Sequence, residues 1–397
     1  MKAFNCPCSL LKPILTIILL NTSCILAQYI NPLKGDLGIH DPSIIIKQGS
    51  NYYIYSTGNL IQVKTSSDKI TWKNRGSLFF SSPSWIKTEV PANNGIDFWA
   101  PDIIFRNNQY WMYYTISTFG SNSSAIALAT SPTLDMSSPT YKWTDRGVVI
   151  KSTGSNDYNC IDPNIFQDTD GKLWMVFGSF WTGIKLTQLD TLSGKPQPST
   201  PIISIASRTS NDLGIEAPFL FKWKNYYYLF VSWDLCCKGV NSTYKIVVGR
   251  ASKVNGPYMD KENKAMTSGG GTILDTGDSR WKGPGGQSIF TENDTAYCVN
   301  HTYDANNNGT PTLMIRPLHW VNDWPTFTNP SSISKTLINS PSVKSSKPSL
   351  IFRSSGSKTG IPYRMELYSI TGARISDRLF KHSSGVFIVK PKQNLSH

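Results

Sequence analysis

The chain has 397 residues, of which 39% are hydrophobic, 12% aromatic and 16% charged, and its net charge is +13 at pH 7. This apolar content supports a sizeable core and excludes an intrinsically disordered protein. The lysines and arginines are scattered, without a basic run or a nucleic-acid-binding motif, so the charge indicates a solvated surface and no nucleic-acid partner.

The first 27 residues have the organisation of a secretory signal peptide. A basic start precedes the short apolar core "ILTIILL", and "ILA" precedes Gln28. Cleavage before Cys24, as in a lipoprotein, is the alternative, but Asn21 stands where an apolar residue is expected. No other stretch approaches the roughly 18 apolar residues of a membrane helix. We therefore expect a secreted, monomeric protein without an integral membrane segment.

A phrase built around a proline recurs along the chain after the signal. "GIHDPSI", "FWAPDII", "CIDPNIF" and "IEAPFLF" place this proline at Pro42, Pro101, Pro163 and Pro218, at spacings of 59, 62 and 55 residues. "GPGGQSIF" around Pro284 is a looser fifth copy. Similarity at a regular period indicates a repeat architecture.

Each repeat reads as about four short strands. An apolar strand follows the proline, then a turn such as "KQGSN" or "DTDGK", an aromatic strand, and two more strands exemplified by "SAIALATS" and "YKWTDRG". No long segment after the signal has helical periodicity. Five such units predict an all-β fold, a five-bladed β-propeller over residues 28–328.

The C-terminal part differs in composition from the repeats. Residues 329–350 are rich in Ser, Pro and Lys and read as a linker. Residues 351–397 alternate apolar and polar side chains between Gly turns, which predicts a small β module.

The four cysteines outside the signal are Cys160, Cys236, Cys237 and Cys298. They are too few and too irregularly spaced for a disulfide scaffold or a zinc site. In an oxidising compartment they allow one bridge, from Cys160 or Cys298 to one of the adjacent pair.

Three of the repeated phrases carry an acid one or two residues before the proline. The innermost strand of every propeller blade lies at the central axis, so Asp41, Asp162 and Glu216 are expected to converge on one pocket. Converging carboxylates suit the hydrolysis of a glycosidic bond, which needs an acid for the leaving oxygen and a second carboxylate for water or for nucleophilic attack.

The surroundings of each acid indicate its role. Glu216 has apolar neighbours that raise the pKa of a carboxyl, so it is the natural acid, and Asp41 beside His40 is the natural base. Asp162 is then a third charge that holds Glu216 protonated and orients the sugar. For each residue the alternative is an inner-strand acid that only caps a turn, and composition does not decide between the two.

Several long motifs in order carry a family resemblance. "HDPSI", "FWAPDI", "CIDPNIF", "GSFWTGI", "GIEAPFL" and "HTYDANNNGTPTLMIRPLHWVNDWP" resemble the five-bladed propeller arabinanases of glycoside hydrolase family 43, from about Gly35 to Pro325. The resemblance implies an inverting mechanism with Asp41 as general base, Glu216 as general acid and Asp162 as pKa modulator. Inversion predicts base and acid carboxyls roughly 6.5 to 9.5 Å apart.

The resemblance also bears on His301 in "NHTYD". Arabinanases of that family hold a metal ion, usually taken as calcium, at the axis through such a histidine and a shell of waters. From the residues alone His301 is read as a hydrogen-bonded core histidine, because calcium prefers six to eight oxygen ligands. With the resemblance, a metal-linked His301 and a calcium cofactor are expected.

Aromatic residues of blades 2 and 3 are candidates for the sugar subsites, because flat aromatic faces pack against sugar C–H surfaces. The candidate substrate-binding residues are Phe98, Trp99, Phe180, Trp181 and His40. Packing between blades is the alternative for the four aromatic residues. Asp102 repeats the motif without a catalytic role and is read as structural.

The expected function is that of a secreted, inverting endo-α-1,5-L-arabinanase acting on the neutral arabinan of pectin. An exo-acting α-L-arabinofuranosidase or β-xylosidase of the same family would share the three acids, but "GSFWTGI" and "HTYDANNNG" favour the endo form. A non-catalytic carbohydrate-binding propeller has no need to bury three like charges together. The tail, with "ELYSITGARI" and "GVFIV", resembles the sorting modules of the type IX secretion pathway, which implies export and surface attachment.

Overall fold

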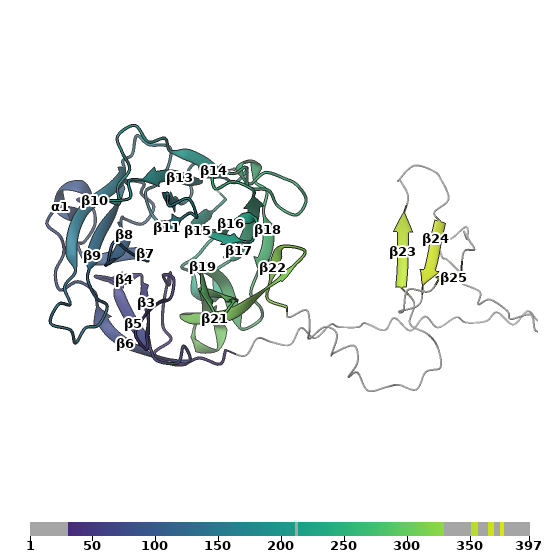
Figure 1. The fold of residues 1–397 in the computed structure, drawn as a ribbon, viewed down its shortest axis with the longest axis horizontal. Coiled ribbons are helices and arrows are strands. Elements are labelled where there is room, and N and C mark those ends of the chain that lie inside the picture. The colour runs from purple at the N-terminus through teal and green to yellow at the C-terminus, as the bar shows by residue number, and fades with distance from the viewer. Residues whose placement is uncertain (1–30, 211–212, 329–350, 356–363, 369–373, 377–397) are drawn as a thin grey trace, which may run out of the picture. The chain divides into compact units, whose positions relative to one another are not determined.

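The computed structural model describes residues 31–210, 213–328, 351–355, 364–368 and 374–376. The chain divides into two compact units, Met1–Asn329 and Pro330–His397. In the first unit, five β-sheets follow one another around a ring in chain order (Figure 1). The predicted all-β, five-bladed propeller is confirmed.

The first two blades have four antiparallel strands each, plus one short additional strand. Blade 1 consists of β2 (Ile46–Gln48), β3 (Asn51–Ser56), β5 (Gln62–Ser66), β6 (Thr71–Ser77) and, parallel to β6, β1 (Lys34–Gly35). Blade 2 consists of β7 (Asp97–Arg106), β8 (Gln109–Ile116), β9 (Ser124–Ser131), β10 (Thr144–Ser152) and, beside β7, β4 (Gly58–Asn59). The short helix α1 (Ile86–Glu89) precedes blade 2.

The other three blades have four antiparallel strands each. Blade 3 consists of β11 (Asn164–Gln167), β12 (Leu173–Phe177), β13 (Ile184–Leu189) and β14 (Ile203–Ala206). Blade 4 consists of β15 (Ile215–Trp223), β16 (Tyr226–Trp233), β17 (Lys245–Ala251) and β18 (Thr272–Asp275). Blade 5 consists of β19 (Trp281–Glu292), β20 (Thr295–Asp304), β21 (Thr310–Val321) and β22 (Trp324–Thr326). Three 3-10 turns, η1 (Gly239–Asn241), η2 (Met266–Ser268) and η3 (Ala305–Asn307), lie in loops of blades 4 and 5.

The core is divided among the five interfaces between neighbouring blades. One cluster of buried apolar side chains lies at each interface, including the interface between blades 5 and 1. The central strands are therefore covered on both faces, and β8 and β9 read as continuous runs of buried residues without apolar–polar alternation. This two-sided burial makes blade packing the main source of stability of the ring.

The N-terminal segment closes the ring against the last blade. Gly38 forms a bridge with Thr312 of β21, the Ile39 N–H donates to the Pro311 carbonyl, and the Leu313 N–H donates to the Leu37 carbonyl. The closing segment leads directly into the first proline phrase, so the seam of the ring lies next to its axis.

One residue of every blade has a left-handed backbone conformation at the axis. These residues are Asp41 (φ 47°), Ala100 (φ 37°), Asp162 (φ 58°), Ala217 (φ 48°) and Gly286 (φ 58°). Each of the five, with the two residues that follow it, lines a small axial cavity of about 40 Å³. A left-handed conformation costs a non-glycine residue roughly 1–2 kcal/mol, so the fold maintains the same strain at four of five equivalent positions.

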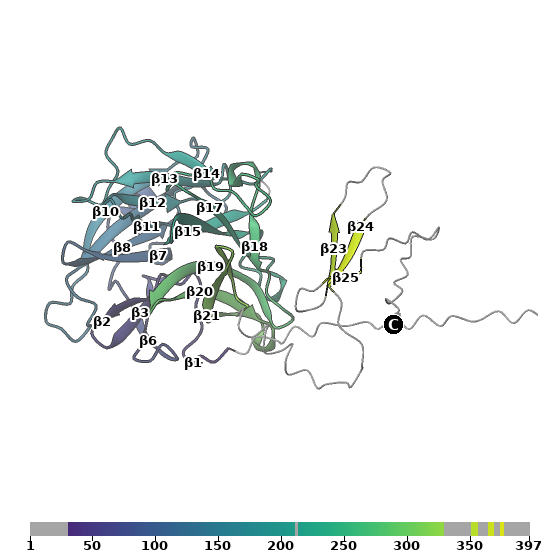
Figure 2. The same ribbon diagram turned by 45° about the vertical axis from the view of Figure 1, so that its right-hand side comes forward.

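The fifth copy of the proline phrase is therefore centred on Gln287, and the sequence prediction of Pro284 is wrong. The pairing of β19 with β20 shifts register twice, between Lys282 and Gly285 and between Gly285 and Ser288. With these bulges the left-handed axial residue is Gly286, and Gln287 follows it where the other four blades have proline. Figure 2 shows β7, β11, β15 and β19, which carry or follow the axial residues of four blades, gathered toward the middle of the ring.

In the second unit, β23 (Ile351–Ser355), β24 (Arg364–Tyr368) and β25 (Arg374–Ser376) form an antiparallel three-stranded sheet. The expected signal peptide and linker lie outside the described residues. Within the described ranges, no helix is long and apolar enough to cross a membrane.

Candidate active site

A cavity of about 1010 Å³ lies on the axis and is lined by residues from all five blades. Asp41, Asp162 and Glu216 all line it. Asp41 and Asp162 also line the small axial cavity, so the two cavities adjoin. The structure thus brings together the three acids that the sequence singled out, from blades 1, 3 and 4.

The repeated backbone conformation explains how the acids reach the cavity. Asp41 and Asp162 occupy the left-handed position itself, whereas Glu216 precedes the left-handed Ala217 by one residue. The pairing of β15 with β16 shifts register between Glu216 and Phe219, and a bulge of this kind redirects the side chain beside it. Blade 2 has Ala100 at the equivalent position, so it contributes no acid there.

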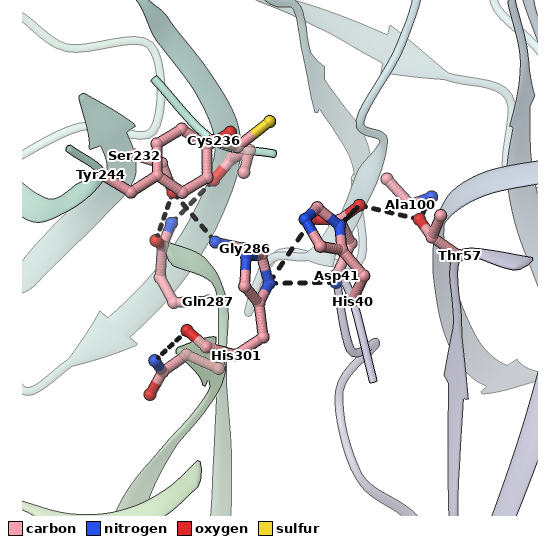
Figure 3. Close-up of polar contacts among 12 residues, drawn as sticks. His40, Asp41, Thr57, Ala100, Ser232, Cys236, Tyr244, Gly286, Gln287 and His301 are labelled. Carbon is pink, nitrogen blue, oxygen red and sulfur yellow. Dashed lines mark hydrogen bonds and ion pairs between the residues drawn. The ribbon is translucent and has the colours of Figure 1, made fainter. Parts of the chain in front are cut away.

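Gly286, the equivalent residue of blade 5, leaves space for its neighbours (Figure 3). A Cβ atom at this position would stand 2.7 Å from Oδ1 of Asp41 and 2.9 Å from Nδ1 of His301. Any side chain larger than hydrogen would therefore collide with both residues.

Asp41 is held in a dense set of polar contacts (Figure 3). Its Oδ2 lies 2.7 Å from Nδ1 of His40 and accepts a 2.7 Å hydrogen bond from Oγ1 of Thr57. Its backbone N–H donates to Nδ1 of His301 at 3.1 Å. Burial alone would raise the pKa of Asp41, but the His40 imidazole and the hydrogen bonds outweigh it and lower the pKa well below the usual range. Asp41 is therefore ionised at neutral pH.

His40 connects Asp41 to blade 5. Its Nε2 lies 2.8 Å from Oη of Tyr303, and its ring stacks on His301 with centroids 3.9 Å apart. Burial opposes the protonated form of His40, but the Asp41 carboxylate prevails and raises the pKa of the imidazole.

Glu216 and Asp162 are buried carboxyls with different partners. Glu216 accepts hydrogen bonds from Oγ of Ser179, at 2.6 Å, and from Oη of Tyr244. Asp162 accepts one from the Ala217 N–H, at 2.9 Å. Burial raises the pKa of both, the hydroxyl donors moderate the rise for Glu216, and the Glu216 and Asp41 charges raise the pKa of Asp162 further. The shifts in pKa therefore favour the protonated forms of Glu216 and Asp162 and the charged form of Asp41.

The structure separates the aromatic candidates. Trp99, Phe180 and Trp181 line the large cavity, and Phe180 and Trp181 are both left-handed (φ 49° and 41°). Two bulky residues in this conformation are strained and indicate that the loop is built to present their rings. Phe98 does not line the cavity, because it is 0% exposed and stacks on Tyr114 with centroids 5.3 Å apart.

Phe119 lines the cavity and was missed by the sequence reading. Its side chain is 81% exposed and meets Trp99 edge to face, with centroids 6.3 Å apart. A Phe in the glycine- and serine-rich stretch "STFGSNSS" was the available signal, because an aromatic side chain in a polar loop has no core to enter.

The predicted pairing of the cysteines is wrong. Cys236 and Cys237 are bonded to each other, and Cys160 and Cys298 are free and buried. Both bonded residues line the cavity. The sequence reading joined the adjacent pair to distant cysteines, but Cys160 and Cys298 are enclosed in the cores of other blade interfaces.

Asp102 is buried and lines only the small axial cavity. It accepts hydrogen bonds from Nδ2 of Asn164, at 2.9 Å, and from the Ile165 N–H, at 2.8 Å, and burial raises its pKa to about 6. These bonds join blade 2 to blade 3, in keeping with a structural role.

His301 is fully buried, and burial with the neighbouring His40 lowers its pKa well below the usual range of a histidine. Its Nε2 is a buried polar atom without a hydrogen-bond partner among the described residues. Together with His40 and Asp41 it forms a group whose ligand atoms lie within 4.8 Å of one another. This group supplies one carboxylate and two imidazoles, so it suits a cation that takes most of its ligands from water.

Comparison with known proteins gives a consistent picture. Glycosyl hydrolases family 43 matches residues 30–325. Over 293 residues the chain is 49% identical to the extracellular endo-alpha-(1->5)-L-arabinanase 1 of Bacillus subtilis (strain 168). The matched region covers 73% of this chain and 87% of that protein. The chain is 40% identical over 298 residues to the extracellular exo-alpha-(1->5)-L-arabinofuranosidase ArbA of Cellvibrio japonicus (strain Ueda107), covering 72% and 85%. The solved family 43 endo-arabinanase from Bacillus licheniformis matches with a TM-score of 0.69 and 46% identity, over 75% of this chain and 100% of that chain.

Proposed function

This chain belongs to glycosyl hydrolases family 43, and from that premise we propose that it is an inverting endo-α-1,5-L-arabinanase. The observation that carries the proposal is the set of three carboxyls that line one large cavity, each with a different electrostatic environment. The enzyme hydrolyses α-1,5-L-arabinofuranosidic bonds, and its substrate is the neutral arabinan of pectin.

Asp41 is the general base. An ionised carboxylate fixed by His40 and Thr57 keeps Oδ1 free of these two partners and available to a water molecule. Such a carboxylate activates the water that attacks the anomeric carbon, while a second group protonates the leaving oxygen. The separation of roughly 6.5 to 9.5 Å between base and acid stays a prediction.

Glu216 is the general acid, and Asp162 is its modulator. The acid must carry a proton when the glycosidic bond breaks, and burial, which raises the pKa of Glu216, favours that protonated form. When Asp162 is ionised, its charge opposes ionisation of Glu216 and keeps that proton on the acid. Ser179 and Tyr244 orient the Glu216 carboxyl and stabilise its charged form after the proton has left.

Trp99, Phe119, Phe180 and Trp181 form the aromatic part of the sugar-binding surface, with His40 beside the base. The cavity of about 1010 Å³ is at the upper end of the range of small-molecule sites, roughly 300–1000 Å³, so it has room for several sugar units. This room supports cleavage within a chain.

A digest of linear α-1,5-arabinan, followed by viscosity and product size together, tests the proposal. A rapid fall in viscosity with mixed oligosaccharides is expected. Slow release of arabinose alone would replace the endo activity by the exo activity named for the Cellvibrio relative. Binding without any product would make the propeller a carbohydrate-binding module.

We further propose that a calcium ion binds beside His301, with His301 Nε2 and water molecules as ligands. The unpartnered, buried Nε2 supports this proposal. A neutral imidazole binds a cation only through its unprotonated nitrogen, so a cation at Nε2 requires the tautomer with the proton on Nδ1. That tautomer gives up the hydrogen bond from the Asp41 N–H and directs Nδ1–H toward Oδ1 of Asp41, 3.7 Å away. When bound, the ion adds positive charge near Asp41. Elemental analysis of the purified protein and its Tm with and without chelator test the site; no bound calcium and an unchanged Tm would remove it.

We also propose that the protein is exported, acts as a monomer, and is sorted by residues 351–397. The two relatives from Bacillus and Cellvibrio are named extracellular, which supports export. A fusion of the C-terminal unit to a fluorescent protein, followed in a host with type IX secretion, tests the sorting role. A fusion retained inside the cell would contradict it.

A further inference from the structure

We propose that the Cys236–Cys237 disulfide is a positioning element for the catalytic base, acting through Tyr303 and His40. The inference rests on the proposed function, in which Asp41 is the base. Sγ of Cys237 also lies 3.7 Å from Nε2 of His40, so the disulfide reaches His40 directly as well as through Tyr303, and it takes no part in the chemical step.

A continuous series of hydrogen bonds connects the disulfide to the base. The Cys237 N–H donates to Oη of Tyr303 at 2.8 Å, Oη lies 2.8 Å from Nε2 of His40, and Nδ1 of His40 lies 2.7 Å from Oδ2 of Asp41. A backbone N–H can only donate, so Tyr303 accepts from Cys237 and meets His40 with its own proton or its second lone pair. The contact between Tyr303 and His40 thus persists in either charge state of the imidazole.

The disulfide fixes the first donor of this series. A bond between adjacent cysteines closes a ring that contains the peptide joining them, including ψ of Cys236 and φ of Cys237. The orientation of the Cys237 N–H depends on that peptide, and Cys237 is held left-handed at φ 67°. Without the ring, this strained conformation would relax and turn the N–H away from Tyr303.

The surrounding loop cannot supply the same constraint. Leu235 and Val240 are 37% and 43% exposed, so the loop has little core of its own. Two hydrogen bonds join the ends of this loop. The Thr243 N–H donates to the Leu235 carbonyl, and the Lys238 N–H donates to Oγ of Ser242, both at 2.9 Å. Neither bond involves the peptide between the cysteines. Among the described contacts, the disulfide and the Cys237 N–H bond to Tyr303 are the constraints on this peptide.

Tyr303 belongs to β20 of blade 5, and Cys237 belongs to the loop after β16 of blade 4. The position of His40 in blade 1 is therefore set by residues of blades 4 and 5. Misplacement of a catalytic group by a fraction of an ångström lowers the rate of the chemical step more than it weakens substrate binding.

Reduction of the native enzyme is the test. Cys237 is exposed, so a water-soluble phosphine reaches the bond, and two additional reactive thiols per chain confirm its opening. On linear α-1,5-arabinan we expect kcat to fall roughly five- to tenfold, the loss of about one hydrogen bond's contribution, with KM within about twofold. Reoxidation should restore kcat. The double variant Cys236→Ser/Cys237→Ser should match the reduced enzyme and be indifferent to the phosphine.

Tyr303→Phe distinguishes positioning from a general loss of structure. This variant lacks the acceptor of the Cys237 N–H, so its kcat should be low already and should fall less on reduction than the kcat of the wild type. Equal losses on reduction in the wild type and in Tyr303→Phe would overturn the inference, as would an unchanged kcat in the reduced wild type. A rise in KM with an unchanged kcat would also overturn it, because it would show that the disulfide contacts the sugar and does not position the base. An untreated enzyme without arabinan hydrolysis would instead overturn the proposed function.

Discussion

Replacing Gly286 by alanine should displace the catalytic base without touching it chemically. The new Cβ would stand 2.7 Å from Oδ1 of Asp41, whereas ordinary contact begins at 3.4 Å, so the carboxylate must move by about 0.7 Å. A shift of that size in a reacting group costs roughly ten- to a hundredfold in rate. We expect kcat/KM on linear arabinan to fall by that factor.

The backbone strain of the substitution can be measured separately. Gly286 has a φ of 58°, where alanine is disfavoured by roughly 1–2 kcal/mol of folding free energy. Gly49 has the same φ of 58° and no atom within 4 Å of its would-be Cβ. Gly49→Ala should therefore lose similar stability in urea unfolding while retaining full activity. Equal activities of the two variants would refute the steric role of Gly286.

Three further predictions concern the acids and the aromatic residues. Glu216→Gln should abolish arabinan hydrolysis while leaving substrate affinity measurable by calorimetry. Glu216→Ala should lose far less activity on an aryl arabinoside than on arabinan, because the aryl leaving group needs little protonation. Equal losses on the two substrates would remove Glu216 from the acid role. In the proposed modulator role, the negative charge of Asp162 raises the pKa of the acid. Asp162→Asn should therefore move the alkaline limb of kcat/KM, where the acid loses its proton, to lower pH, and an unmoved limb would contradict the modulator role. Phe119→Ala should raise KM with an unchanged Tm. Phe98 is fully buried, so Phe98→Ala should cost roughly 3–5 kcal/mol of stability. A loss of stability in Phe119→Ala and a raised KM without that loss in Phe98→Ala would contradict the roles given to the two residues.

The fold and the three acids could be predicted from sequence because both depend on short, repeated signals. The proline phrase marks the axis in four blades, and in three of them an acid stands one or two residues before the proline. The fifth axial position could not be located in this way, because Gly286–Gln287 lacks the proline and two bulges shift the register of β19.

The surroundings of the acids were beyond the reach of sequence patterns. Ser179 and Tyr244 contact Glu216 from 37 and 28 residues away, and Tyr303 contacts His40 across 263 residues. Such contacts depend on how neighbouring blades are packed, and no local period records that packing. The separation of Phe98 from Trp99 had the same cause, since adjacent strand residues point to opposite faces and only the assembled blades show which face meets the cavity.

The closing segment gives the active site a mechanical dependence on the whole ring. Leu37–Ile39 is hydrogen-bonded to the last blade, and the next two residues are His40 and Asp41. The ring is closed by the contact between this segment and β21, and the catalytic base lies within two residues of that contact. If blades 1 and 5 separate at this contact, Asp41 moves out of position before the other sheets change. The rate of hydrolysis therefore depends on the closed ring.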